Sequence, residues 1–285
     1  MNKLPSEKRA QILNMMVEGM SIRSIARMTG ASKNTIVKLL ADAGRACADY
    51  QDEHLRGLKS KRLQLDEIWS FIGAKEKNVP KDQKGQGRGD AWTWTAIDAD
   101  SKLIVSWLVG DRSGETARVF VCDLAERLSH RVQVTTDGHK AYLEGMDAAF
   151  AGEVDYAMLE KVYHEEGSQR GPRRYSPGRM VRSFTTCCSG NPDKAHISTS
   201  YAERQNLNIR MGLRRFTRLT NAFSKKVENH VHALSIYFMH YNFARIHQTL
   251  RVSPAMAAGV TDKLWSMEDV VRMVEAYENK TESMN

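Results

Sequence analysis

The sequence predicts an α/β protein, in which a mixed β-sheet flanked by helices follows an all-helical N-terminal region. Three observations predict this class. The first 45 residues repeat apolar side chains at helical spacing, whereas apolar runs from residue 63 onward are short, rich in Val, Ile and Trp, and separated by Gly and Asp. After residue 200 the chain again has helical spacing. The resulting order of strands and helices is typical of a mixed sheet with helices packed on it.

Three short helices are predicted within residues 1–45. Each begins at a capping signal and ends at or near a glycine. The starts are Pro5-Ser6, Ser21 and Ser32, and the ends are Gly19, Gly30 and Gly44. Two helices joined by a tight turn that contains glycine form the helix-turn-helix pattern, which MSIRSIARMTGASKNTIVKLL matches over its whole length. A generic three-helix bundle is the alternative.

The start of the third helix is predicted to contact DNA. Its first residues are polar and would point into a major groove. They are Ser32, Lys33, Asn34 and Thr35, followed one turn later by Lys38. Asparagine can read adenine, and lysine can read guanine or touch a phosphate.

The rest of the chain divides into alternating strands and helices. Strands are expected at 63–73, 91–100, 102–110 and 131–138, with the second and third forming a hairpin, and a further apolar run lies near 154–163. Helices are expected at 114–129, 139–150, 200–220, 224–243 and 267–278, and 165–199 is expected to be irregular. The predicted units are 1–45, a linker or connecting helix at 46–62, a sheet domain at 63–260, and a C-terminal helix and tail at 261–285.

The distribution of charge favours a polyanionic partner. The formal net charge is +8, and two basic stretches contain no acid: 170–182 has arginines, and 204–226 has arginines and lysines. Neutralising phosphates with such residues releases counterions, which favours binding to nucleic acid. The second stretch supplies the candidate DNA-binding residues Arg204, Arg210, Arg214, Arg215 and Arg218. Solvated surface charge is the alternative interpretation.

Several other classes of protein are not expected. No run approaches the roughly 18–20 apolar residues of a membrane helix, and the N-terminus does not resemble a secretion signal. The four cysteines, Cys47, Cys122, Cys187 and Cys188, form no C-x-x-C pair, so reduced thiols in a cytoplasmic protein are expected rather than a zinc site.

Three acids are candidates for binding metal ions. Asp66 lies inside an apolar strand, where an unpaired carboxylate is costly. Asp137 closes the fourth strand, at the end where open sheets place ligand-binding groups. Glu203 begins a long helix. Alone, Asp137 could be a turn former and Glu203 a first-turn helix acid, and Glu67 is expected to face away from Asp66.

The segments LDEIWSFIG, TTDGHKAY and SYAERQNLNIRMGLRRFTRLT together resemble the three acidic motifs of DDE-type insertion-sequence transposases, most of all the insertion-sequence-one family. YNFARIHQTLRVSPAMAAG at 241–259 resembles the tail that follows them. The resemblance implies a ribonuclease H-like fold over 63–260, with Asp66, Asp137 and Glu203 as catalytic ligands of two Mg²⁺ ions, or of Mn²⁺. Unlike many members of that family, this chain has no cysteine-rich zinc element at its N-terminus.

The resemblance also implies the reaction and its partners. The ends of a mobile element are hydrolysed, and the freed 3′-hydroxyl attacks target DNA, without a covalent intermediate or a nucleotide cofactor. Double-stranded DNA is the expected partner, with a homo-oligomer assembled on two ends in a bacterial, nucleoid-associated location. The alternatives are a non-catalytic helix-turn-helix regulator, and a related integrase or nuclease. His139 could touch the scissile phosphate or cap a helix. The residues Tyr241, Asn242, Arg245 and His247 could buttress the site, bind phosphate or pack.

Overall fold

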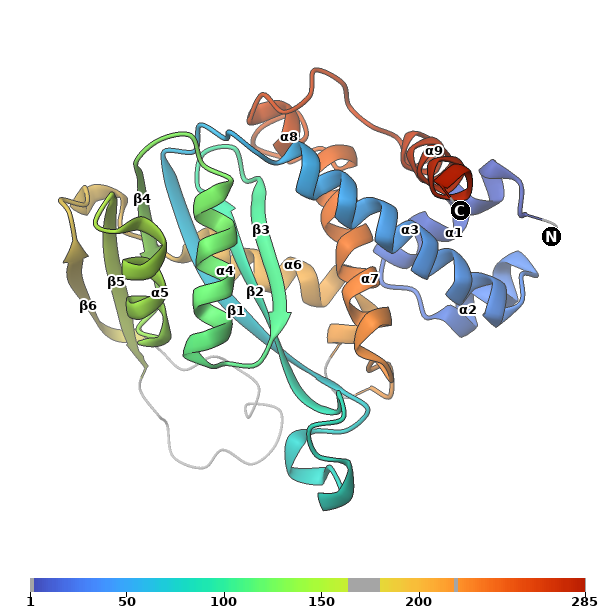
Figure 1. Cartoon of the computed structure of the whole chain (residues 1–285), viewed down its shortest axis with the longest axis horizontal. Coiled ribbons are helices and arrows are strands. Elements are labelled where there is room, and N and C mark those ends of the chain that lie inside the picture. The colour runs from blue at the N-terminus through green and yellow to red at the C-terminus, as the bar shows by residue number, and fades with distance from the viewer. Residues whose placement is uncertain (1–2, 164–179, 218–219, 285) are drawn as a thin grey trace.

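The centre of the molecule is a six-stranded mixed sheet with the order β3-β2-β1-β4-β5-β6 (Figure 1). The computed structural model describes residues 3–163, 180–217 and 220–284. The strands are β1 Arg62–Ile72, β2 Gly89–Asp98, β3 Ile104–Gly110, β4 Val132–Thr136, β5 Val154–Tyr163 and β6 Met180–Ser189. β4 runs parallel to β1 and β5, whereas the pairs β1–β2, β2–β3 and β5–β6 are antiparallel. The predicted fold class, a mixed sheet flanked by helices, is confirmed.

Helices cover both faces of this sheet. Helices α4 (Gly114–Glu126) and α5 (Ala141–Phe150) pack together on one face, and α6 (Ser200–Gly212) packs on the other, against β1 (Figure 1). The buried ring of Trp94 on β2 contacts the rings of Phe120 on α4 and Tyr142 on α5. Burial of these rings fixes the position of the helices relative to the central strands.

The N-terminal helices begin where the sequence predicts. They are α1 (Ser6–Val17), α2 (Ile22–Thr29) and α3 (Lys33–His54). The hydroxyls of Ser21 and Ser32 accept hydrogen bonds from the third backbone amide after them, as N-caps do. Gly30 ends α2 with φ +70°, a conformation that favours glycine. Ile25 of α2 is fully buried, whereas Met28 is 62% exposed.

The prediction that the third helix ends near Gly44 is wrong, because α3 continues to His54. Gly44 is buried where α3 crosses α7 (Val227–Met239), and a Cβ atom there would lie 2.4 Å from the Cβ of His232. The carbonyl of Gly44 also accepts a hydrogen bond of 2.8 Å from the hydroxyl of Ser235. This glycine therefore permits a close helix crossing and does not stop the helix.

The C-terminal part of the chain packs on the N-terminal helices. Helix α7 continues into one turn of π-helix, His240–Ala244, followed by α8 (Pro254–Ala257) and α9 (Met267–Met284). Helix α9 lies against α1 and α3 (Figure 1), where buried Arg9 forms ion pairs with Glu275 and Glu278. Residues of α1, α3, α7 and α9 belong to the same apolar core as the sheet. None of the described helices is both long and apolar enough to cross a bilayer.

Two further expectations need correction. Residues 180–189, placed in an irregular segment, form edge strand β6, whose side chains are mostly exposed on both faces and therefore lack the alternation that predicts a strand. The rest of that basic segment, up to residue 179, lies outside the described residues. Helix α6 ends at Gly212 and not at 220, and a 3₁₀ turn, Arg214–Phe216, follows it.

Candidate active site

Asp66 and Asp137 lie side by side on adjacent parallel strands. The register pairs Leu63 with Val134 and Gln64 with Thr135, and two more steps bring Asp137, just beyond the end of β4, level with Asp66. Both side chains are half-buried. The parallel pairing of β1 with β4 thus brings both carboxylates to one point of the sheet.

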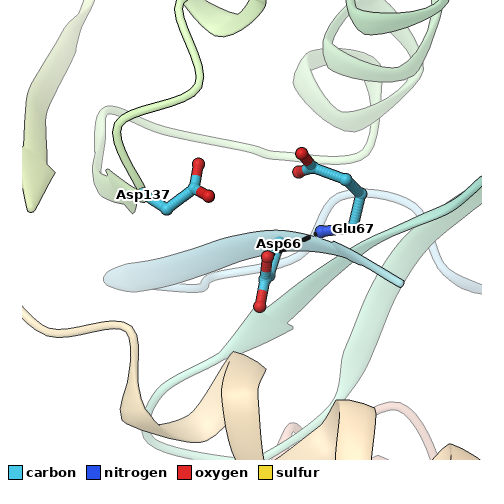
Figure 2. A group of neighbouring side chains, drawn as sticks. All are labelled: Asp66, Glu67 and Asp137. Atoms are coloured by element: carbon cyan, nitrogen blue, oxygen red, sulfur yellow. Dashed lines mark hydrogen bonds between the residues drawn. The ribbon is translucent and has the colours of Figure 1, made fainter. Parts of the chain in front are cut away.

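Glu67 is a third member of this cluster and was not among the predicted metal ligands. It points to the opposite face of β1 from Asp66, as expected for neighbouring strand residues (Figure 2). Nevertheless, one carboxylate oxygen from each of Asp66, Glu67 and Asp137 lies within 4.8 Å of the others. These oxygens come together because Asp137 lies beside β1. The residues next to Asp66 in the sequence do not indicate this proximity.

The carboxylate of Glu67 is buried and bound on several sides. Arg112 donates a hydrogen bond of 2.7 Å to it, and the hydroxyl of Tyr142 donates another of 3.1 Å. The guanidinium of Arg112 also lies 4.7 Å from the ring centroid of Trp92. Nε2 of His139 is 4.0 Å from the same carboxylate and has no hydrogen-bond partner within the described chain. Glu67 is therefore the most firmly positioned of the acids.

Glu203 lines the same pocket but lies outside this close group. It is exposed in the first turn of α6, where Lys161 and the Thr199 hydroxyl, at 2.7 Å, donate hydrogen bonds to its Oε1 atom. The pocket is open, has a volume of about 590 Å³, and includes Asp66, Asp137 and Glu203 in its lining. All three predicted acids therefore share one pocket, with Glu203 held by a lysine.

The electrostatic environment of Asp66 disfavours its ionised form. Burial, followed by the nearby charges of Glu67 and Asp137, raises the pKa of Asp66 to about 7. Burial and Asp137 also raise the pKa of Glu67, against the opposing effect of Arg112. Two hydrogen bonds of 2.8 Å orient Asp66, one from the Glu67 amide and one from the Asn206 side chain. A cation bound among these oxygens would relieve the repulsion.

The donor set suits a hard divalent cation. Mg²⁺ and Mn²⁺ prefer carboxylate oxygens and retain several waters, so two or three carboxylates suffice. Asp66, Glu67 and Asp137 offer such oxygens close together, and Glu203 offers another across the pocket. The described residues therefore fit the expected metal.

The residues expected to read DNA lie on the surface at the start of α3. Lys33, Asn34 and Thr35 are exposed. The Ser32 hydroxyl caps the helix, 2.9 Å from the hydroxyl of Thr35, and Lys38 forms an ion pair with Asp42. Lys33 and Asn34 are thus the two side chains of this group that are not engaged in a cap or an ion pair. Their contact with DNA stays a prediction.

The candidate basic residues after Glu203 do not lie along one helix. Arg204 is exposed on α6, and Arg210 is half-buried there and engaged with a neighbouring group. Arg214 and Arg215 lie in the 3₁₀ turn beyond Gly212, where Arg214 is exposed and Arg215 half-buried. Arg218 lies outside the described residues. The expectation of one long basic helix is wrong because α6 ends at Gly212.

Tyr241 and Asn242 have structural contacts. Tyr241 is only 3% exposed, and burial raises its pKa. The side chain of Asn242 accepts a hydrogen bond of 2.9 Å from the amide of Ile104 and donates one of 3.0 Å to its carbonyl. Asn242 therefore satisfies the backbone of edge strand β3, which supports the packing role among the interpretations left open.

No model of a protein family and no curated protein matches this sequence. A solved structure of a piggyBac transposase synaptic complex with hairpin DNA is similar over 94% of this chain and 70% of its own, with 11% identity and a TM-score of 0.39. Two Mos1 transposase structures, one a paired-end complex with the left transposon end and one a mariner paired-end complex with Mn, each cover 52% of this chain and 57% of theirs. Their identities are 10% and 9%, and their TM-scores are 0.22 and 0.21. Likeness at this level does not establish a shared function.

Proposed function

We propose that this protein is a DNA transposase that binds the ends of an insertion sequence, cleaves them in a metal-dependent reaction and transfers the 3′-hydroxyl into target DNA. One observation carries the proposal. Asp66 from β1, Asp137 from the end of β4 and Glu203 from α6 line one open pocket, although 70 and 65 residues separate them. The proposal depends on these residues and on their motifs, and not on the distant structural likenesses.

Each side chain has a distinct task in this proposal. Asp66 and Asp137 would hold the metal ions, and Glu203, whose carboxylate is paired with Lys161, would complete the set of ligands. Bound Mg²⁺ or Mn²⁺ would supply activation of the attacking oxygen and stabilisation of the leaving one. Lys161 and Arg112, the cations that line the pocket, would then bind the scissile phosphate.

The N-terminal helices supply DNA recognition in the same proposal. Lys33 and Asn34 are exposed at the start of α3, where a recognition helix enters the major groove. Exposed Arg204 lies next to Glu203 on α6 and would contact the backbone near the cleaved bond. Because two ends must be joined, we expect a homo-oligomer to assemble on DNA.

Cleavage and joining of DNA test the proposal. The purified chain is incubated with Mg²⁺ and labelled duplexes that carry the ends of the element, alongside Asp137→Asn and the matched control Asp147→Asn, an exposed acid on α5 outside the pocket. We expect the wild type and Asp147→Asn to cleave and join the ends, and Asp137→Asn to bind them without cleavage. Cleavage without joining would indicate a related nuclease, and binding without cleavage by the wild type would indicate a regulator.

Two further variants identify the acid that completes the site. We expect Glu203→Gln to abolish cleavage, because it removes a carboxylate that faces the pocket. Glu67→Gln should retain part of the activity, because the amide oxygen can still accept the hydrogen bond from Arg112 while the amide nitrogen donates to the hydroxyl oxygen of Tyr142. The reverse result would make Glu67 the third ligand, since its oxygens lie closer to those of Asp66 and Asp137.

A further inference from the structure

A second pocket, of about 570 Å³, lies between the N-terminal helices and the segment that follows α6. One wall is formed by the end of α1 and the first turn of α2, and the other by residues 213–215, 221–225 and α7. The two walls meet closely, since a Cβ atom at Gly19 would lie 2.9 Å from the carbonyl oxygen of Met211 at the end of α6. The pocket thus joins the candidate DNA-reading helices to the helix that carries Glu203.

The charge of this pocket has one sign. Its lining contains four cations, Arg23, Arg214, Arg215 and Lys225, and no aspartate or glutamate. In the part of the chain that the structure describes, none of the four forms an ion pair. Elsewhere in this protein cations are commonly paired, as Arg9, Arg112 and Arg127 are. Four unpaired cations around one cavity attract an anion.

Arg215 is the least solvated of the four. Its guanidinium donates one hydrogen bond, of 2.9 Å, to the hydroxyl of Ser224. That hydroxyl lies 2.8 Å from Nδ1 of His230, a fully buried ring whose Nε2 atom is 3.3 Å from the Ser70 hydroxyl. Burial lowers the pKa of His230 to about 3 and that of Arg215 to about 10, so at neutral pH the ring is neutral and the guanidinium charged. Its charge has no counterion among the described residues.

The first turn of α2 adds to the positive potential. Ser21, Ile22 and Arg23 line the pocket, and the Ser21 hydroxyl is already used to cap the amide of Ser24. The earlier amides of the turn, those of Ile22 and Arg23, have no intrahelical acceptor. The beginning of a helix, with its free amides and dipole, favours a bound anion.

We propose that this pocket binds a phosphate group, with half-buried Arg215 on one wall and exposed Arg23 on the other as its ligands. If the transposase function proposed above holds, the occupant is a backbone phosphate of DNA. That DNA would run from the N-terminal helices to the pocket lined by Asp66, Asp137 and Glu203, here called the acid pocket. Free inorganic phosphate has the same chemistry, and the experiment below separates the two sources.

Thermal unfolding of the full chain tests phosphate binding without any catalysis. Sodium phosphate is compared with sodium chloride at equal pH and ionic strength. We expect phosphate to raise the melting temperature of the wild type and of the control Arg27→Gln, an exposed cation of α2 outside the pocket. In Arg215→Gln and Arg23→Gln the apparent affinity should fall by about tenfold or more. Arg23 is exposed, so its variant remains informative should Arg215→Gln fail to fold.

Equal effects of phosphate and chloride on the wild type, or equal stabilisation of all variants by phosphate, would overturn the proposal. DNA binding then identifies the source. If a backbone phosphate occupies the pocket, Arg215→Gln lowers the slope of log DNA affinity against log salt concentration by about one. Arg27→Gln controls for the loss of one surface charge, and this variant should still be stabilised by phosphate. An unchanged slope with lost phosphate stabilisation identifies free phosphate. Both results are independent of cleavage, which Asp137→Asn tests separately.

Discussion

Asp66 is expected to destabilise the metal-free protein as the pH rises. Its pKa is about 7 in the folded chain and 3.8 in the reference state, so between these values the folded state retains a proton that the unfolded state has lost. Stability from this group is therefore fully present below pH 3.8 and is lost as the pH rises through about 7. Asp66→Asn should remove this loss and stabilise the metal-free protein at pH 8 by ~1.4 kcal/mol per unit of pKa shift.

Urea unfolding at pH 5 and pH 8 in the presence of EDTA measures this effect. Because Asp66 and Glu67 are neighbours whose pKa values are both raised, their protons leave in coupled steps, and the measured transition belongs to the pair. An Asp66→Asn variant no more stable than the wild type at pH 8 would show that water or a rearrangement already solvates this carboxylate.

Lys161 should compete with metal ions for Glu203. Its ammonium donates to the Glu203 carboxylate inside the acid pocket, so a cation that approaches this carboxylate meets both a positive charge and an occupied oxygen. The pair is partly exposed, and such pairs contribute about 1 kcal/mol at most. We therefore expect Lys161→Met to tighten Mg²⁺ binding by about fivefold. Titration calorimetry measures this, with exposed Lys194→Met as the control; weaker binding would mean that Lys161 organises the site.

At the scale of elements, Gly44 shows how a packing constraint is hidden in the sequence. An alanine there would place its Cβ atom 2.4 Å from that of His232, so α3 and α7 would have to move apart. We expect Gly44→Ala to lower the free energy of unfolding by about 2 kcal/mol, even though alanine is the better helix former. Chemical denaturation measures this, and exposed Arg45→Ala on the same helix should change stability by less than about 0.5 kcal/mol.

Local signals explain why most elements could be predicted and a few could not. Ser21, Gly30 and Ser32 act through contacts with their own neighbours in the chain, so their spacing is enough to place two helix starts and one end. Gly44, like Gly30, follows a run of apolar residues at helical spacing and therefore looks like a helix end. Its role, however, depends on contact with a helix about 190 residues away in the sequence. Strand β6 lies at an edge with both faces exposed, so no apolar pattern marks it.

The same distinction applies to the candidate site. The sequence places Asp66 inside one strand and Asp137 at the end of another, but their proximity depends on the parallel pairing of β1 with β4. The contacts of Lys161 with Glu203 and of Arg112 with Glu67 join residues 42 and 45 positions apart. Such contacts depend on sheet order, which the spacing of residues does not contain, and so the cations of the pocket were missed.

At the scale of the whole molecule, the last helix should be essential for the fold of the first. Val270, Val271 and Val274 of α9 are buried, and Glu275 and Glu278 pair with buried Arg9 of α1. Removing residues 267–285 would expose the apolar surface that three buried valines cover, at about 1.5 kcal/mol or more each, and would leave Arg9 unpaired. The apolar loss alone, about 4.5 kcal/mol, is close to the lower end of the stability of a typical domain.

We therefore expect the chain truncated after Ser266 to lose more helix than α9 alone contains, and to become sensitive to protease within α1 and α2. Circular dichroism and limited proteolysis measure these two effects. A second variant, Glu275→Gln with Glu278→Gln, separates the ion pairs from the apolar contacts and should cost less stability than the truncation. A truncated chain that melts at the wild-type temperature would instead support the sequence-based division, in which 261–285 is a separate helix and tail. In that case α1 would be held by α2, α3 and α7 without help from the C-terminus.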